Sequence, residues 1–148
     1  MIADLEFAER PAVRGLHVAK VSDRVTATDF AAVLSEAFGF PQDICEAEFV
    51  DKAFWREEAY ASVSYYHDKP ASVSSVIIVD QILYVGLVAT RPAFRNKGPS
   101  YETNYLLLEE AMAETGIRRA ALHATDAGRP IYEKLGFRPV MTIAGFGF

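Results

Sequence analysis

The sequence predicts an α+β fold with three-layer α/β character, in which helices flank a central mixed, mostly antiparallel sheet. Between residues 61 and 90, three strand-like segments are joined by short turns, which favours an antiparallel meander. From residue 82 onward, strand and helix patterns alternate, which favours helices layered against a sheet. A length of 148 residues suits one compact unit, so we expect residues 1–148 to form a single domain.

The front of the chain predicts a strand followed by a helix. Gly15–Asp23 alternates weakly between apolar and polar residues, as a strand does. Thr28 is expected to cap a helix that stops at Gly39. One face of this helix carries the apolar residues Phe30, Val33, Leu34, Ala37 and Phe38.

A second helix is predicted from Asp43 and Glu46, which resemble a capping box, to about Trp55. This front part is acidic, because residues 1–60 carry twelve acidic and six basic side chains, a balance of −6. Such charge suits a cationic acceptor such as an amine. It is equally the pattern of an ordinary solvated surface.

The meander consists of three predicted strands. The first is Ala61–His67, followed by a turn at Asp68–Pro70. The second is Val73–Val79, which is rich in β-branched residues, and the tight turn Asp80–Gln81 leads from it into the third, Ile82–Thr90.

The back of the chain predicts two further helices and two strands. A helix over Ser100–Glu114 ends at Gly116. A short strand over Arg119–Ala124 follows, then a helix over Ala127–Leu135, and a last strand over Phe137–Ile143.

Composition excludes several classes of protein. The chain has 51% hydrophobic residues, 24% charged residues and a net charge of −5, as a globular protein does. Cys45 is the only cysteine, and no His, Asp or Glu cluster has metal-ligand spacing, so we expect no disulfide and no metal. Neither a basic face nor a membrane-length apolar run is present, so we expect a cytoplasmic protein that binds neither nucleic acid nor membrane.

The segment Val88–Ser100 is the most informative stretch. It runs from a strand through a loop with Arg95, Lys97 and Gly98 into the start of a helix. A helix N-terminus offers unpaired N–H groups and a partial positive charge, glycine permits close approach, and two cations add attraction. The pattern indicates a phosphate site, although a basic loop that merely precedes a helix would look the same.

This stretch resembles the acetyl-CoA signature of the GNAT superfamily of N-acetyltransferases. The signature is Arg or Gln, two residues, Gly, one residue, then Gly or Ala, and Arg95, Gly98 and Ser100 occupy those places. A second block, Ala124–Phe137, is similar to the segment that closes the superfamily's fold, where a helix with a tyrosine ends in Leu-Gly-Phe. The resemblance covers about residues 61–140.

The resemblance implies an acetyl-CoA-dependent N-acetyltransferase that transfers the acetyl group directly to a small amine or a protein amino group. Residues 1–60 would supply the helices of the acceptor side, and residues 61–148 the acetyl-CoA-binding core. Strand Ile82–Thr90 would splay from strand Arg119–Ala124 and open a slot for pantetheine. The implied acetyl-CoA contacts are Val88, Ala89, Thr90, Arg95, Asn96, Lys97, Gly98, Pro99 and Ser100.

The resemblance also implies catalytic roles. The main-chain N–H of Val88 would hold the acetyl oxygen, and Tyr132 would lie beside the sulfur and protonate the departing thiolate. No acidic residue or histidine stands on the splayed strand, so His123 is the candidate base, with a purely structural histidine as the alternative. Gly86 fits either the bulge that the family places in this strand or an ordinary core glycine.

Some residues depart from the family pattern. Ser100 replaces the usual Gly or Ala, Pro99 removes a backbone donor, and Glu102 adds a carboxylate to the first helical turn. These departures leave open a second interpretation, a catalytically degenerate GNAT-like domain that binds CoA or a protein partner. Because the family has a further strand after the one starting at Phe137, we expect a homodimer partner or the segment Met1–Arg14 to cover that edge.

Overall fold

A computed structural model describes residues 1–9, 12–51 and 59–145. In chain order its elements are β1 (Ile2–Asp4), β2 (Leu16–Lys20), α1 (Arg24–Phe38), α2 (Gln42–Glu46), the π-helical turn η1 (Ala47–Asp51), β3 (Ala59–Tyr66), β4 (Lys69–Val79), β5 (Ile82–Thr90), the 3-10 turn η2 (Pro92–Phe94), α3 (Pro99–Thr115), β6 (Arg119–Leu122) and α4 (Arg129–Lys134).

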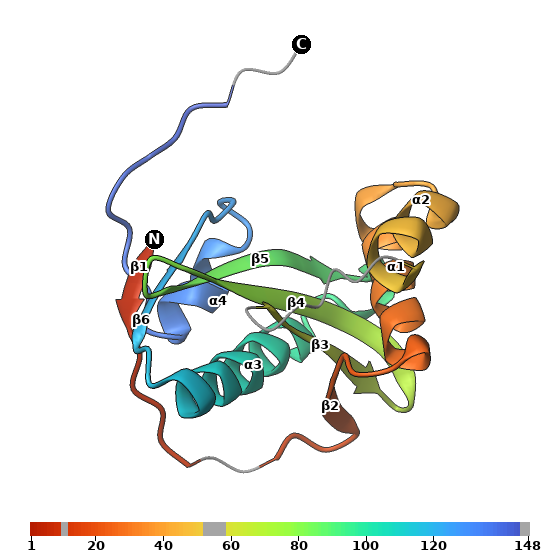
Figure 1. Cartoon of the computed structure of the whole chain (residues 1–148), viewed down its shortest axis with the longest axis horizontal. Coiled ribbons are helices and arrows are strands. Elements are labelled where there is room, and N and C mark those ends of the chain that lie inside the picture. Colours follow the sequence, from red (N-terminus) through yellow and green to blue (C-terminus); the bar gives the residue numbers. More distant parts are fainter. Residues whose placement is uncertain (10–11, 52–58, 146–148) are drawn as a thin grey trace.

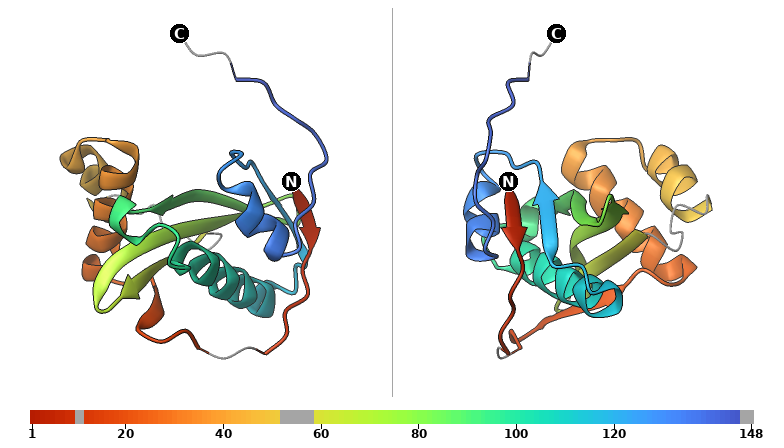
Figure 2. Two further views of the ribbon diagram at one scale, coloured as in Figure 1. Left: turned by 180° about the vertical axis from the view of Figure 1, so that it is seen from behind. Right: turned by 60° about the vertical axis from the view of Figure 1, so that its left-hand side comes forward.

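The strands form a six-stranded sheet in the order β1-β6-β5-β4-β3-β2. Strands β5 and β6 pair in parallel, whereas every other neighbouring pair is antiparallel, so the predicted mixed, mostly antiparallel sheet is confirmed. Helix α3 packs on one face and α1 on the other, near opposite ends of the sheet (Figures 1 and 2). The predicted layering of helices against a central sheet is therefore also confirmed.

Two tight turns connect the meander. His67 and Asp68 have φ values of 47° and 64°, and Asp80 and Gln81 have values of 48° and 62°. Two consecutive left-handed residues match the twist of the strands that they join. The turn at Asp80–Gln81 is as predicted. The other begins one residue before the predicted Asp68, because β4 already starts at Lys69.

Helix α1 begins earlier than its sequence predicts. Its cap is Asp23, whose Oδ1 accepts a hydrogen bond from the Thr26 amide at 2.8 Å, while Thr28 lies inside the helix and donates its hydroxyl to the Arg24 carbonyl. The prediction of a Thr28 cap was wrong because an aspartate five residues upstream satisfies the first free amides. The stop at Gly39, with φ 71°, is confirmed.

The capping box predicted at Asp43 and Glu46 is not formed. Pro41 precedes α2 without a side-chain cap, and Asp43 lies within the first turn. Glu46 instead accepts a hydrogen bond from Gln42 Nε2 at 2.8 Å. The predicted end of this helix near Trp55 lies outside the described residues.

The predicted last strand over Phe137–Ile143 was wrong. Of these residues only Arg138 pairs with another strand, exchanging backbone hydrogen bonds of 3.0 and 2.8 Å with Ile2. Beyond it the chain runs away from the sheet (Figure 1). Strand β1, which the sequence did not predict, pairs with β6. The segment Met1–Arg14 therefore supplies a strand at this edge, which was one of the two expected ways of covering it.

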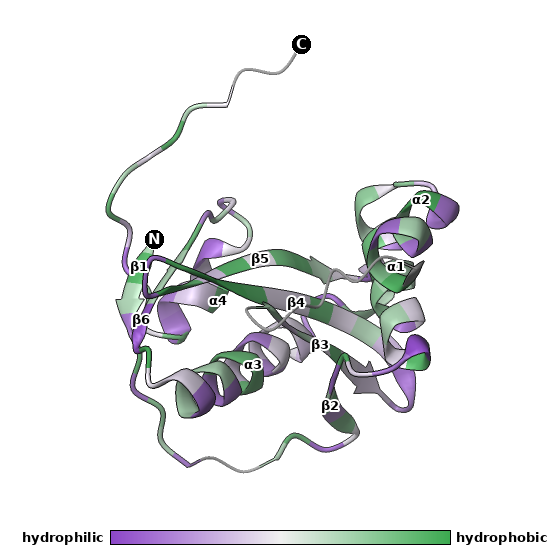
Figure 3. Cartoon of the chain, in the orientation of Figure 1, coloured by the Kyte–Doolittle hydropathy of each residue, from purple (hydrophilic) through white to green (hydrophobic). Residues whose placement is uncertain are grey.

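The core has two parts, one on each side of the sheet. The larger part lies under α3 and α4 and includes Leu5, Leu83, Leu107 and Leu122. The smaller part lies under α1 and is centred on Phe30 and its helical neighbours. Hydrophobic residues follow β5 through the middle of the molecule, whereas hydrophilic ones mark the β4–β5 turn (Figure 3).

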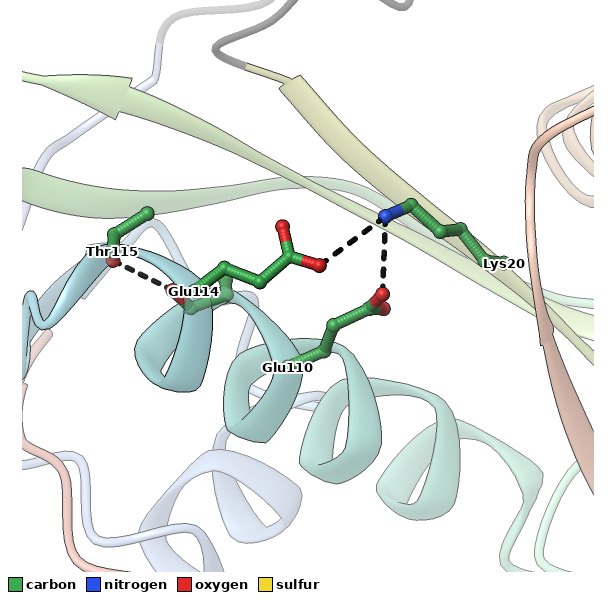
Figure 4. Close-up of polar contacts among 5 residues, drawn as sticks. Lys20, Glu110, Glu114 and Thr115 are labelled. Atoms are coloured by element: carbon green, nitrogen blue, oxygen red, sulfur yellow. Dashed lines mark hydrogen bonds and ion pairs between the residues drawn. The ribbon is translucent and has the colours of Figure 1, made fainter.

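The far end of the sheet is tied to α3 through Lys20 of β2. Its Nζ lies 3.1 Å from Glu110 Oε1 and 3.7 Å from Glu114 Oε1 (Figure 4). The hydrogen bond to Glu110 raises the pKa of Lys20 above its ordinary value. Exposed pairs of this kind stabilise a protein by at most about 1 kcal/mol, so the cluster orients β2 more than it holds the fold together.

The N-terminal segment is an integral part of the core, and this can be tested at Leu5. Its side chain is 1% exposed, so Leu5→Ala should lower the free energy of unfolding by about 2–5 kcal/mol in urea denaturation. Val25→Ala, at a position that is 69% exposed, should change it by less than about 0.5 kcal/mol. Equal effects of the two substitutions would contradict the docking of this segment.

Candidate functional site

Strands β5 and β6 pair along only the first half of β5. The parallel pairing with β6 joins Leu83 to Ala120, Tyr84 to Ala121 and Val85 to Leu122, and in the described structure it goes no further. From Gly86 to Thr90, β5 keeps its partner β4 but has no strand on its other side. The predicted splayed pair is therefore present, and it leaves a row of backbone groups open to a ligand.

An irregularity in β5 lies at the point of divergence. Ser75 pairs with Gly86, but Val73 pairs with Ala89, so β5 has one residue more than β4 in this interval. Such a bulge bends the strand. The left-handed residue is Leu87, with φ 49°, whereas Gly86 is not in that region. The predicted bulge exists, but glycine is not what its backbone requires.

The backbone groups of β5 after the bulge alternate between the side of β4 and the opposite side. The carbonyl of Ala89 accepts a hydrogen bond from Ser72 Oγ of β4 at 2.9 Å, and Arg91 N–H bonds to Ala71. Successive residues of a strand turn their backbone groups to opposite sides. Val88 and Thr90 therefore direct their N–H and C=O groups away from β4, and on that side the Thr90 carbonyl accepts a hydrogen bond from Arg95 Nε.

The loop after β5 is held by its own side chains. Arg95 Nε donates to the Thr90 carbonyl at 3.3 Å. Lys97 Nζ lies 5.7 Å from the ring centre of Tyr66 and 5.9 Å from that of Phe94, within cation–π range of both. Asn96 between them has φ 62°. Two positive charges thus lie on the surface directly before α3.

The N-terminus of α3 begins with a glycine cap followed by a proline. Gly98 is the N-cap, with φ 89°, and it provides no side-chain cap. An added Cβ at Gly98 would meet nothing within 4 Å, so the requirement for glycine there is conformational rather than steric. Pro99 is buried at the first helical position and removes one N–H, so the first backbone donor within the helix is that of Ser100.

Two residues that sequence reasoning missed fix this helix head to the sheet. Asn104 is fully buried; its Nδ2 donates to the Ser100 carbonyl at 2.8 Å and its Oδ1 accepts from Ser74 Oγ of β4 at 2.8 Å. Thr103 Oγ1 also donates to the Pro99 carbonyl at 2.7 Å. The available signal was an asparagine on the apolar stripe of a helix, opposite a strand rich in serine.

Tyr132 lies on α4 and is 7% exposed, among the residues of the larger core. Its ring is close to Gly128, where an added Cβ would lie 3.2 Å from Tyr132 Cε2. Burial raises the pKa of Tyr132 to about 12, so the phenol keeps its proton at neutral pH. The helix therefore presents a neutral proton donor on the β6 side of the sheet.

His123 directly follows the last paired residue of β6. Its Nδ1 lies 3.1 Å from the hydroxyl of Tyr84 on β5, and the ring centres are 5.9 Å apart. The histidine is exposed and Tyr84 is half-buried. Sequence reasoning named His123 but not its partner, because their pairing depends on the register of β5 and β6.

Two cavities flank α3 on the side of the N-terminal segment. One, of about 330 Å³, is lined by Glu102, Tyr105 and residues of the segment before β2. The other, of about 320 Å³, lies between Tyr101, the end of α4 and residues 6–9. The carboxylate-bearing residue Glu102 thus faces the first cavity, and its amide bonds to the Gly98 carbonyl at 3.2 Å.

Two further searches concern the described ranges alone. Within residues 1–9, 12–51 and 59–145, no three His, Cys, Asp or Glu side chains are placed to hold a metal ion. In the same part of the chain, every helix is too short or too polar to cross a membrane.

The arrangement matches known structures closely, although the sequence matches no family model and no curated protein. A GCN5-related N-acetyltransferase from Kribbella flavida superposes with a TM-score of 0.68 and 22% identity, over 92% of this chain and 50% of that one. The chain has the GNAT fold. The resemblance that the motifs indicated is thereby confirmed for the architecture.

Two further structures with the GNAT fold extend the comparison. AAC(6')-Iy in complex with the bisubstrate analog CoA-S-monomethyl-acetylneamine gives a TM-score of 0.71 at 10% identity, over 90% of this chain and 97% of that one. A predicted acetyltransferase from Clostridium acetobutylicum with acetyl-CoA gives 0.67 at 16% identity, over 89% and 96%. The chain spans nearly all of the length of these two proteins. It spans about half the length of the Kribbella flavida protein and of a putative acetyltransferase from Pyrococcus horikoshii.

The conformational role of Gly98 in this GNAT fold can be tested with a matched pair of substitutions. Gly39 also caps a helix, with φ 71°, and has open space around it. Because both positions are left-handed, Gly98→Ala and Gly39→Ala should each lower the free energy of unfolding by about 1–2 kcal/mol. Denaturant titration measures both, and an unchanged stability in Gly98→Ala would contradict the geometry of the loop.

Proposed function

We propose that the protein is an acetyl-CoA-dependent N-acetyltransferase that transfers the acetyl group directly to a small amine or a protein amino group. The observation that carries the proposal is the end of β5–β6 pairing at Val85 and Leu122, beside the N-terminus of α3 with its partial positive charge. Acetyl-CoA is an extended thioester that carries a diphosphate, so its shape and charge suit an unpaired strand next to a helix N-terminus. The GNAT fold of the chain supports the same assignment.

The residues of the loop and of α3 would bind the diphosphate. The amide of Ser100, the partial positive charge at the N-terminus of α3 and the side chains of Arg95 and Lys97 all favour an anion. Ala89 and Asn96 would contribute to the shape of the site. Val88 and Thr90 would pair through their main chains with the amides of the pantetheine arm, as an added strand does.

Acetyl-CoA supplies an activated acyl group, and the residues of the chain would assist its transfer. The neutral amine nitrogen forms a bond to the carbonyl carbon while the carbon–sulfur bond breaks. The nitrogen loses one proton to solvent as the amide forms, and solvent restores the proton that Tyr132 gives up. The Val88 N–H would stabilise the negative charge that develops on the carbonyl oxygen. Tyr132, which burial keeps protonated, would give its proton to the thiolate.

The binding step can be tested by titration calorimetry with acetyl-CoA. Gly98→Ala should weaken binding about ten- to a hundredfold, the effect of losing one hydrogen bond to a charged group. Gly39→Ala, which has a similar conformational cost but caps another helix, should bind as the unaltered protein does. If millimolar acetyl-CoA gives neither heat nor thermal stabilisation of the unaltered protein, the proposal fails.

The role of Tyr132 can be tested by kinetics with a panel of primary amines. Tyr132→Phe should lower kcat roughly a hundredfold without weakening the binding of acetyl-CoA. Because the pKa is raised to about 12, ionisation of Tyr132 should not reduce the rate between pH 7 and 10.

A matched control for this substitution is Tyr105→Phe, which also removes a hydroxyl from the same core. Tyr105 donates to the Ala8 carbonyl, so its loss should lower stability by about 1 kcal/mol and leave kcat unchanged. A different outcome would favour a catalytically degenerate domain. In that case the protein would bind acetyl-CoA but would not consume the thioester, and Tyr132→Phe would have no effect.

A further inference from the structure

A hydrogen-bonded tyrosine–histidine pair bridges the two strands at the point where they separate. Tyr84 is in the second of the three β5–β6 pairs, and His123 is the first residue beyond the last pair. The hydroxyl of Tyr84 lies 3.1 Å from His123 Nδ1. The pair thus links the strands at the closed end of the slot.

Strand alternation places the pair on the face of the sheet opposite α3. Leu83 and Val85 on either side of Tyr84 belong to the core under α3, so Tyr84 points the other way. Its cross-strand neighbours on that face are Ile77 of β4 and Ala121 of β6. Ile77 is 38% exposed, which shows that α1 leaves this part of the face uncovered.

The position is within reach of the proposed reaction centre. Tyr84 precedes Gly86 by two residues, a separation of about 7 Å along the strand. Gly86 has no side chain and lies on the same face as Tyr84, at the start of the bulge. An added Cβ at Gly86 would lie 3.9 Å from Tyr84 Cε1, so the Tyr84 ring leans along the strand toward the bulge and toward Val88, whose N–H would hold the acetyl oxygen.

We propose that Tyr84 and His123 form a proton relay that removes a proton from the ammonium group of the acceptor, an inference that rests on the proposed function. The ammonium gives a proton to the Tyr84 oxygen as the Tyr84 hydroxyl gives its own to His123 Nδ1. The products are a neutral amine, a neutral tyrosine and an imidazolium. His123 is exposed, so exchange of protons with solvent returns the imidazolium to the neutral ring that carries its proton on Nε2.

The relay requires one tautomer of His123, which can be observed without any substrate. Nδ1 must accept the hydrogen bond, so the neutral ring must carry its proton on Nε2. Side-chain ¹⁵N chemical shifts of the unaltered protein should show this tautomer, and Tyr84→Phe should reduce its predominance. A proton found on Nδ1 in the unaltered protein would overturn the relay.

Kinetics test the chemical step. With the best primary amine of the panel at pH 7, Tyr84→Phe and His123→Gln should each lower kcat/KM roughly a hundredfold. The double substitution should cost little more than either one, because the two groups act as a unit. With the hydrazide analogue of that amine, which is already neutral at pH 7, all three variants should approach the unaltered protein.

A structural role for the pair gives different results. It would reduce transfer to the amine and to the hydrazide alike, and either that outcome or full activity of Tyr84→Phe overturns the relay.

His17→Gln is the matched control, because the exposed His17 stacks on Tyr65 at 4.9 Å at the far end of the sheet. If the unaltered protein acetylates no amine, the proposed function falls with the relay. If it does and the variants match it, only the relay falls.

Discussion

The extra residue in β5 is the constraint on which the rest of the site depends. A strand in the middle of a sheet normally has partners on both sides, and unpaired backbone groups in a protein interior are costly. Here the bulge at Leu87 lies where pairing with β6 ends, and it holds a leucine in a left-handed conformation at φ 49°. Backbone strain of about 1–2 kcal/mol is retained only where the surroundings enforce it. The open groups of Val88 and Thr90 are the consequence.

A buried polar connection keeps this opening in register with the helix that follows it. The strand face under α3 carries buried serines beside its apolar residues, and Ser74 bonds directly to Asn104. Small side chains let the helix approach the sheet closely, while Asn104 also holds the carbonyl of Ser100 in the first turn. A buried polar group must be satisfied to be tolerated, so this geometry is specific. The N-terminus of α3 is therefore fixed relative to β5.

Local patterns in the sequence predicted most of this architecture, and tertiary relations account for the failures. The limits of β5, the turn at Asp80–Gln81 and the glycine stops followed from propensity and periodicity, which are local properties. Strand β1 was missed because three residues contain no period, and its partner Arg119–Leu122 is more than a hundred positions away. The residues Phe137–Ile143 have strand propensity, but the place beside β6 is occupied by β1. The Tyr84–His123 contact likewise could not be predicted from the sequence, because it depends on the register in which β5 and β6 pair and not on a sequence motif.

The departures from the GNAT signature are compatible with binding when the whole loop is considered. Pro99 removes a donor, but its fixed φ and buried ring also restrict the backbone at the helix head. Arg95 is bonded to Thr90, and Lys97 lies against Tyr66 and Phe94, so the loop is already held before any ligand arrives. A pre-organised loop loses less conformational entropy on binding, which offsets part of the lost hydrogen bond. Glu102, the residue expected to compete for the helix head, lines a cavity on the N-terminal side of α3. The sequence changes that argued most strongly against a CoA site thus have structural roles in the loop and in the first turn of α3.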